Sequence, residues 1–89
     1  MSLPHQHLAK IEEDFATGNV ERAKSELARI TIANTWDSEH NLNNAMGAIL
    51  ALSKGDLAEL SKLVDAALID FRDVIYWWSL EQSKPRNKP

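Results

Sequence analysis

The sequence predicts an all-α fold, a small antiparallel bundle of about four helices. Apolar residues recur at three- and four-residue spacings along most of the chain, and no segment shows sustained alternation of apolar and polar residues. Short links separate the predicted helices, and an antiparallel bundle buries the apolar stripes of such helices best. Because 89 residues suffice for one domain, we expect a single helical domain at 1–83 and a flexible basic tail at 84–89.

Two helices are predicted before residue 31. Pro4 suits the first turn of a helix, since its missing N–H would have no partner there. "TGN" at 17–19 is expected to end this helix, with Gly18 in the left-handed conformation and Asn19 capping the next helix. The first apolar stripe consists of Leu8, Ile11 and Phe15. The second stripe consists of Val20, Ala23, Leu27 and Ile30.

A connection and a third helix are predicted next. Residues 31–37 are β-branched and polar, which favours a connecting segment with Trp36 packed over it. Asp37 or Ser38 is expected to cap the third helix, and Gly55 is expected to end it. The apolar face of this helix consists of Leu42, Met46, Ile49 and Leu50.

The fourth segment has the strongest helical pattern. Its apolar positions alternate at three and four residues: Leu57, Leu60, Val64, Ala67, Phe71, Val74 and Trp78. Asp56, with Glu59 three residues later, resembles a capping box at its start. A continuous helix to Gln82 would be roughly 39 Å long, and few domains of this size can cover such a rod. We therefore favour a bend or break near Asp70, which would cap a short final helix with Asp73 in its first turn.

The stretch "DFRDVIYWWSLE" at 70–81 is apolar on two sides. If Phe71 faces the core, Trp78 lies near it on the helix, whereas Tyr76 and Trp77 lie about 120–140° away. This second side consists of Ile69, Tyr76, Trp77 and Leu80. A helix that is apolar all round is normally buried, which favours coverage by the first helix or the N-terminal segment. The alternative is an exposed patch that binds another protein or a second copy of this one.

Arg72 has no acidic residue three or four positions away. We expect its partner to be a carboxylate across the bundle, for example at 12–14, a group in a partner protein, or the Tyr76 ring. Asp70 and Asp73 are interpreted as structural residues that cap a helix, as Asp56 does. Nothing in the sequence supplies the nucleophile, glycine-rich loop or oxyanion hole that catalysis would need beside these carboxylates.

Composition and charge exclude several function classes. The absence of cysteine excludes disulfides and thiolate chemistry. Without the three cations of the tail, seven basic residues face thirteen acidic ones, so nucleic-acid binding is not expected. The longest apolar run, at 45–52, is too short to cross a membrane, and no signal-peptide pattern precedes it, which favours a cytoplasmic protein. The histidines, at His5, His7 and His40, are interpreted as solvated or capping residues, and we expect no metal or cofactor.

Residues 55–78 carry a recognisable combination of motifs. A Gly-Asp helix start is followed, about 14 residues later, by an Asp-aromatic-Arg-Asp-Val element and a closing aromatic residue. The positions concerned are Gly55, Asp56, Asp70, Phe71, Arg72, Asp73, Val74, Tyr76 and Trp77. This pattern resembles small bacterial helical proteins of unknown function, although Trp78 departs from it. The resemblance covers the last third of the chain and implies a compact helical fold in a bacterial or phage setting, with no activity attached.

These observations favour a non-enzymatic protein that acts by binding another protein. The residues expected to form its binding face are Ile69, Arg72, Tyr76, Trp77 and Leu80. A small acidic cytosolic protein suits a regulatory or toxin-neutralising (immunity-type) role, because complementary charge speeds encounter. Two alternatives are a homodimeric structural protein that associates through the fourth helix, and an enzyme or metal protein that uses Asp70, Asp73 and the histidines.

Overall fold

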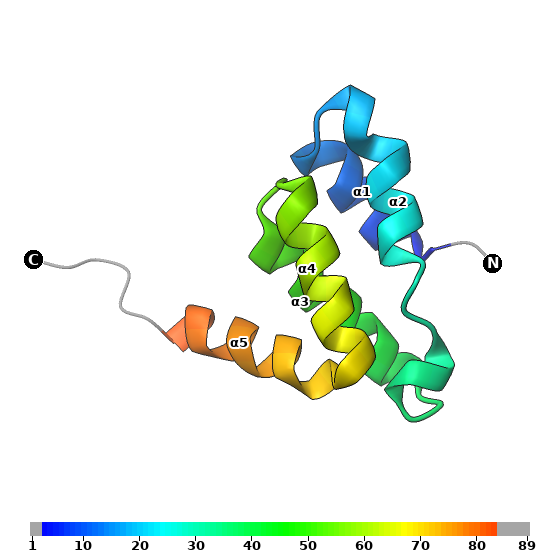
Figure 1. Ribbon diagram of the computed structural model, residues 1–89, viewed down its shortest axis with the longest axis vertical. Helices are drawn as coiled ribbons and strands as arrows, with labels where there is room; N and C mark the ends of the chain where they lie inside the picture. The colour runs from blue at the N-terminus through cyan, green and yellow to red at the C-terminus, as the bar shows by residue number, and fades with distance from the viewer. Residues whose placement is uncertain (1–2, 84–89) are drawn as a thin grey trace, which may run out of the picture.

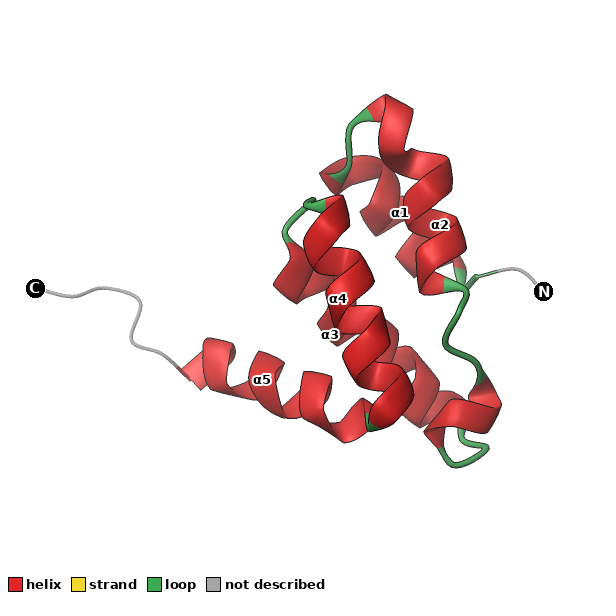
Figure 2. Cartoon of the chain, in the orientation of Figure 1, coloured by secondary structure: helices red, strands yellow, loops and turns green. Residues whose placement is uncertain are grey.

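The computed structural model describes residues 3–83, and every regular element in this range is a helix (Figure 1, Figure 2). The α-helices are α1 (His5–Asp14), α2 (Val20–Leu27), α3 (Glu39–Ser53), α4 (Leu57–Ile69) and α5 (Phe71–Ser83). Two short 3-10 helices, η1 (Thr17–Asn19) and η2 (Ile32–Thr35), lie in the connections. The all-α prediction is confirmed. The described helices number five rather than four because the predicted fourth segment forms two of them, and the predicted tail at 84–89 lies outside the described residues.

The central element is α3, which contacts α1, α4, α5 and η2. Helices α1 and α2 form a hairpin that packs on α3 and α4, as Figure 1 shows. The chain turns back after α3, so that α4 packs beside it, and it turns again at Asp70, where α5 leaves the end of α4 at a wide angle (Figure 1). The last helix follows α3 in the same direction, since the start of α5 contacts Trp36 and Trp78 lies over Gly47. The described helices therefore pack compactly around α3, and α5 follows α3 in the same direction.

The predicted apolar stripes meet in one core. It consists of Ile11, Phe15, Ala23, Leu27, Ile30, Ala45, Met46, Ala48, Ile49, Leu50, Leu60, Leu63, Val64, Ala67, Phe71 and Val74. Five of these residues come from α3, which explains why that helix is central. Leu42 and Trp78, predicted on the same faces, are half-buried against the core. The spacing of apolar residues thus predicted the buried side of α2 to α5, because side chains three and four apart share one face. On α1 the buried residues are His7 and Ile11, and Leu8, predicted in the stripe, is only half-buried.

The end of the first helix differs from the prediction. Pro4 occupies the position before the helix, and α1 runs from His5 to Asp14. Phe15 then adopts extended backbone (φ −103°, ψ 145°), and its side chain is buried in the core. Gly18 lies in η1 and does not have positive φ, and Asn19 makes no side-chain cap bond. The helix therefore ends where Phe15 turns into the core, three residues before the glycine.

The predicted boundaries of α3 and α4 are confirmed. Ser38 caps α3 by accepting a hydrogen bond from the Asn41 N–H at 3.1 Å. At the other end Lys54 and Gly55 adopt positive φ (51° and 80°), which turns the chain. Asp56 then caps α4, since its Oδ1 accepts from the N–H groups of Ala58 and Glu59 at 2.9 and 3.1 Å.

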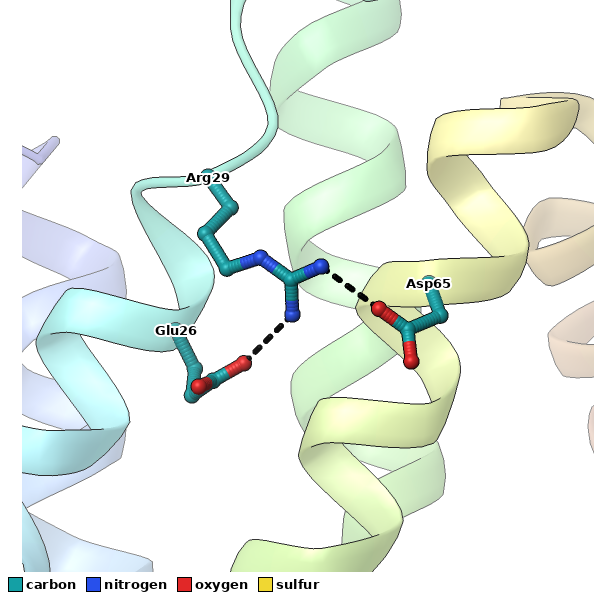
Figure 3. A network of polar contacts seen from close by, with 3 residues as sticks. All are labelled: Glu26, Arg29 and Asp65. Carbon is teal, nitrogen blue, oxygen red and sulfur yellow. Dashed lines mark hydrogen bonds and ion pairs between the residues drawn. The ribbon is translucent and has the colours of Figure 1, made fainter.

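An ion-pair network joins the end of α2 to α4 (Figure 3). Arg29 donates from Nη1 to Glu26 at 2.7 Å and from Nη2 to Asp65 at 2.5 Å. The hydrogen bond to Asp65, and then the one to Glu26, raises the pKa of Arg29 above its ordinary value. These charges lie at the surface, so the network contributes more to the register of the two helices than to stability.

None of the helices among residues 3–83 is both long enough and apolar enough to cross a membrane.

Candidate protein-binding surface

The predicted break between α4 and α5 is confirmed at Asp70. This residue has extended backbone (φ −156°, ψ 105°), and its N–H closes α4 by donating to the Ala66 carbonyl at 2.9 Å. Its Oδ1 accepts the N–H of Arg72 at 3.0 Å, which opens α5. Asp73 lies in the first turn of the new helix, near the positive end of its dipole. One residue thus ends one helix and caps the next.

The partner of Arg72 differs from the prediction. Its Nε donates to Asp70 Oδ1 at 2.9 Å and its Nη2 to Oδ2 at 2.7 Å, which makes a bidentate pair two residues apart. A carboxylate across the bundle, at 12–14, is not involved. Side chains two residues apart on one helix point away from each other. Asp70, however, lies outside both helices, so its side chain folds back over the first turn of α5.

This pair sets the charge state of Asp70. The hydrogen bond from the Arg72 side chain, followed by the one from the Arg72 N–H, lowers the pKa of Asp70 from 3.8 to about 2. The same contact raises the pKa of Arg72. Asp70 is therefore ionised at neutral pH and holds no proton to donate, whereas a general acid needs a raised pKa.

Trp36 also lies beside the start of α5, which the sequence pattern did not predict. Its backbone is left-handed (φ 61°), as is that of Asp37 (φ 55°), and few bulky residues adopt this conformation. The Asp37 N–H donates to the Ile32 carbonyl at 2.9 Å, and Asn41 Nδ2 donates to the carbonyl of the buried Thr35 at 3.3 Å. These bonds hold the strained turn that carries the indole.

The indole of Trp36 reaches the start of α5 instead of covering its own connection. It meets the Phe71 ring edge-to-face, with centroids 5.1 Å apart and planes at 87°. The guanidinium of Arg72 lies over the Trp36 ring, 5.1 Å from its centroid. The predicted cation–π partner, Tyr76, is therefore wrong, and Arg72 lies between an indole and a carboxylate. Trp36 itself is 66% exposed.

The second apolar side of the C-terminal segment is exposed. Ile69 is 87% exposed, Tyr76 61%, Leu80 47% and Trp77 39%. The sequence favoured coverage by the first helix or the N-terminal segment. Coverage by the first helix is wrong, because α1 packs on α2 and α3, and residues 1–2 of the N-terminal segment lie outside the described residues. Trp78 is the aromatic that turns inward, half-buried over Gly47.

These side chains form one surface. Along α5, Tyr76 and Leu80 lie one turn apart on the side opposite Phe71 and Val74, and Trp77 flanks them. Ile69 and Arg72 lie at the corner where α5 begins, and Trp36 joins through its contact with Arg72. We name this set the α5 surface: Trp36, Ile69, Arg72, Tyr76, Trp77 and Leu80. It contains every exposed large apolar side chain of residues 3–83.

The histidines do not converge. His7 is buried, and its Nε2 lies 2.7 Å from Asn43 Oδ1, an acceptor, so Nε2 donates. The expectation of a solvated or capping role is therefore wrong for His7, which joins α1 to α3. His40 pairs with Asn44 at 3.1 Å. Among residues 3–83 no three His, Cys, Asp or Glu side chains lie where they could share a metal ion.

A shallow hollow of about 180 Å³ lies between the end of α3 and α5. The residues around it are Ala51, Leu52, Lys54, Trp78, Glu81 and Gln82. Typical small-molecule pockets measure roughly 300–1,000 Å³ and enclose most of their ligand, so this hollow does not resemble one.

No protein-family model, curated protein or solved structure was found to match this chain.

Proposed function

We propose that this protein is a binding module that recognises another protein through the α5 surface. The observation that carries the proposal is the gathering of all exposed large apolar side chains of residues 3–83 along α5 and at its N-terminal corner. Single exposed apolar residues are normal, whereas several large ones close together are typical of an interaction site. Three of the five lie on α5, Ile69 ends α4, and Trp36 contacts the start of α5.

The chemistry of the surface supports this role. Tyr, Trp and Arg are the side chains most often found as energetic anchors of interfaces, because they bury a large area with few rotatable bonds. Two of the anchors are already held in place: Arg72 by its bidentate bond to Asp70, and Trp36 by its edge contact with Phe71. Side chains that are ordered before binding lose less conformational entropy on binding.

The charge of the surface indicates what kind of partner it fits. Asp70 already neutralises Arg72, so the α5 surface suits an apolar patch on the partner more than a phosphate or an acidic peptide. The acidic body would speed encounter with a basic partner. An acidic body and an apolar binding surface suit a regulatory or toxin-neutralising role. The resemblance of residues 55–78 to small bacterial helical proteins supports a bacterial setting.

The test is capture of partners from a lysate of the source organism with matched baits. Tyr76→Ser and Trp77→Ser remove anchors, whereas Lys62→Ser removes a side chain that is 74% exposed on α4 and serves as the control. We expect each anchor variant to reduce recovery of a specific partner at least tenfold, as a loss above about 1.4 kcal/mol implies. Folded anchor variants that keep every partner of the unaltered protein would contradict the proposal.

A further inference from the structure

Asp73 lies on the outer side of α5, among the apolar side chains of the α5 surface. Asp73 and Leu80 are seven positions apart, so they share one line along the helix axis. Tyr76 and Trp77 follow Asp73 by three and four positions, and their side chains therefore lie one turn further along, on either side of that line. All four residues are exposed. They form a single face with a carboxylate at one end and Leu80 at the other.

The carboxylate of Asp73 has no ion-pair partner among the described residues. The neighbouring cation, Arg72, donates instead to both oxygens of Asp70. The ion pairs in the described part of the chain join other side chains. Asp37, next to Trp36 at the corner of the surface, is exposed and has no described ion pair either. The α5 surface is therefore apolar and carries uncompensated negative charge where α5 begins.

The helix itself offsets the charge of Asp73 only in part. Asp73 lies in the first turn of α5, where the helix dipole is equivalent to roughly half a positive elementary charge. This position favours a carboxylate, but it supplies no side-chain donor. The carboxylate oxygens therefore remain available to a cation from outside.

From this arrangement we infer that the partner places a basic amphipathic helix on the α5 surface, with a Lys or Arg side chain that pairs with Asp73. The apolar side chains of that helix pack against Tyr76, Trp77 and Leu80. The inference rests on the proposed function and specifies the chemistry of its partner. Seven residues span about 10 Å along a helix, so the cation and the furthest apolar anchor of the partner lie about two turns apart on one face.

The helical form of the partner segment follows from what the surface offers. Every regular element among residues 3–83 is a helix, so this part of the chain has no strand edge with which an extended segment could pair. Recognition therefore depends on side chains. Those of α5 stand in rows spaced by three and four residues, and such rows fit into the grooves between the side chains of a second helix.

The positive charge of the partner segment follows from Asp73 and from the charge of the whole body. Burying an ionised carboxylate against an apolar face without a cation is costly, whereas a paired cation compensates for the lost hydration. Residues 3–83 also hold thirteen Asp and Glu against seven Lys and Arg. The resulting field attracts a basic segment and repels an acidic one.

Model peptides titrated into the full chain test the inference. The probe is an amphipathic peptide of about 18 residues, or five helical turns, built from Leu and Lys. One comparison peptide has Glu in place of Lys, and the other has the composition of the probe in a shuffled order that forms no apolar face. We expect the probe to bind at least about tenfold more tightly than either in calorimetric titrations. In NMR spectra, the signals that shift should be those of Trp36 and residues 69–80.

Matched substitutions test the contact with Asp73. Asp73→Asn and Glu12→Gln each remove one exposed carboxylate, the first on the α5 surface and the second on α1. We expect Asp73→Asn to weaken binding of the Leu/Lys peptide about fivefold or more, and Glu12→Gln to weaken it less than about twofold. Equal effects would mean that only the overall charge attracts the peptide, which overturns the inference. Circular dichroism melts establish that both variants are folded.

Other outcomes also decide the matter. A Leu/Glu peptide or a shuffled peptide that binds as tightly as the probe overturns the inference, as does a set of shifted signals outside the α5 surface. No binding of the probe at concentrations up to about 1 mM likewise overturns it.

Partner capture separates this inference from the proposed function. A partner that is lost with Tyr76→Ser and Trp77→Ser but retained by Asp73→Asn supports the proposed function and overturns the cation contact. Folded anchor variants that retain every partner contradict the proposed function itself, whatever the peptides show.

Discussion

Arg72 lies 5.1 Å from the ring centroid of Trp36, a residue 36 positions earlier in the chain. The contact joins the left-handed turn after η2 to the first turn of α5 and holds both side chains at the surface. Asp70 accepts two hydrogen bonds from the same guanidinium, one from Nε and one from Nη2. An exposed indole is thereby ordered before any partner arrives, which is the property that a binding anchor needs.

The left-handed backbone at Trp36 predicts an unusual order of stabilities for two substitutions. Trp36→Gly and Trp36→Val both remove the indole and its contacts with Phe71 and Arg72. Valine is β-branched and strained at φ 61°, whereas glycine is not. We expect Trp36→Val to unfold at a lower urea concentration than Trp36→Gly. The expected difference in the free energy of unfolding is about 1 kcal/mol. Equal values for the two variants would mean that the backbone there carries no strain.

The Asp70–Arg72 pair predicts a pH dependence of stability. The pKa of Asp70 is lowered from 3.8 to about 2, so the unfolded chain takes up this proton more readily than the folded one. The contribution of Asp70 is therefore fully present above about pH 4 and is lost as the pH falls through about 2. An NMR titration of the Asp70 carboxyl group checks the pKa directly, and a midpoint near 3.8 would contradict it.

Urea unfolding measured between pH 2 and pH 6 tests the pH dependence of stability that Asp70 contributes. Asp70→Asn keeps a side-chain acceptor for the helix cap but loses the ion pair with Arg72, so its stability should depend less on pH in this range. Glu12→Gln changes an exposed carboxylate on α1 and serves as the control. The control should retain the pH dependence of the unaltered protein.

Two glycines are predicted to respond oppositely to alanine. Gly55 has φ 80°, and a Cβ there would collide with the Asp14 carbonyl oxygen. Gly55→Ala should lower the free energy of unfolding by more than about 1 kcal/mol. A Cβ on Gly18 would meet nothing within 4 Å, so Gly18→Ala should be neutral or stabilise by up to about 1 kcal/mol. Thermal unfolding of both variants checks this, and a neutral Gly55→Ala would contradict the close approach of α1 to the α3–α4 turn.

Substitutions of two isoleucines distinguish the core from the exposed α5 surface. Ile49 on α3 is fully buried, and Ile49→Ala should cost about 2–5 kcal/mol in the free energy of unfolding. Ile69 is 87% exposed, and Ile69→Ala should change stability by less than about 0.5 kcal/mol. Denaturant titration measures both. A large loss of stability in Ile69→Ala would mean that Ile69 is covered within the folded chain.

The helix boundaries that local chemistry controls were predictable. Ser38, Asp56 and Asp70 each accept a hydrogen bond from an N–H two or three residues later, and such a contact needs only the neighbouring residues. The break at Asp70 was predicted from the capping ability of Asp70 and from the length of the apolar pattern, which is too long for one helix of so small a domain. Gly55 also behaved as predicted, because the left-handed conformation is a property of its own backbone.

The features that sequence reasoning missed depend on distant contacts. Nothing next to Phe15 signals that burial of its ring ends α1 before Gly18. His7 is buried because Asn43, 36 residues away, accepts its hydrogen bond. Trp36 belongs to the α5 surface only because η2 places it against Phe71.

The sequence by itself determined the all-α class, the inner faces of α2 to α5 and the point at which the last long segment breaks. Periodicity and capping act within a few residues, so they can be recognised without knowledge of the fold. Only the tertiary structure decided which apolar face remained uncovered. Both sides of residues 69–80 carry apolar residues, and the packing of α1 on α2 and α3 leaves Ile69, Tyr76, Trp77 and Leu80 facing solvent. Burial depends on where other elements lie, and no pattern within one helix specifies that.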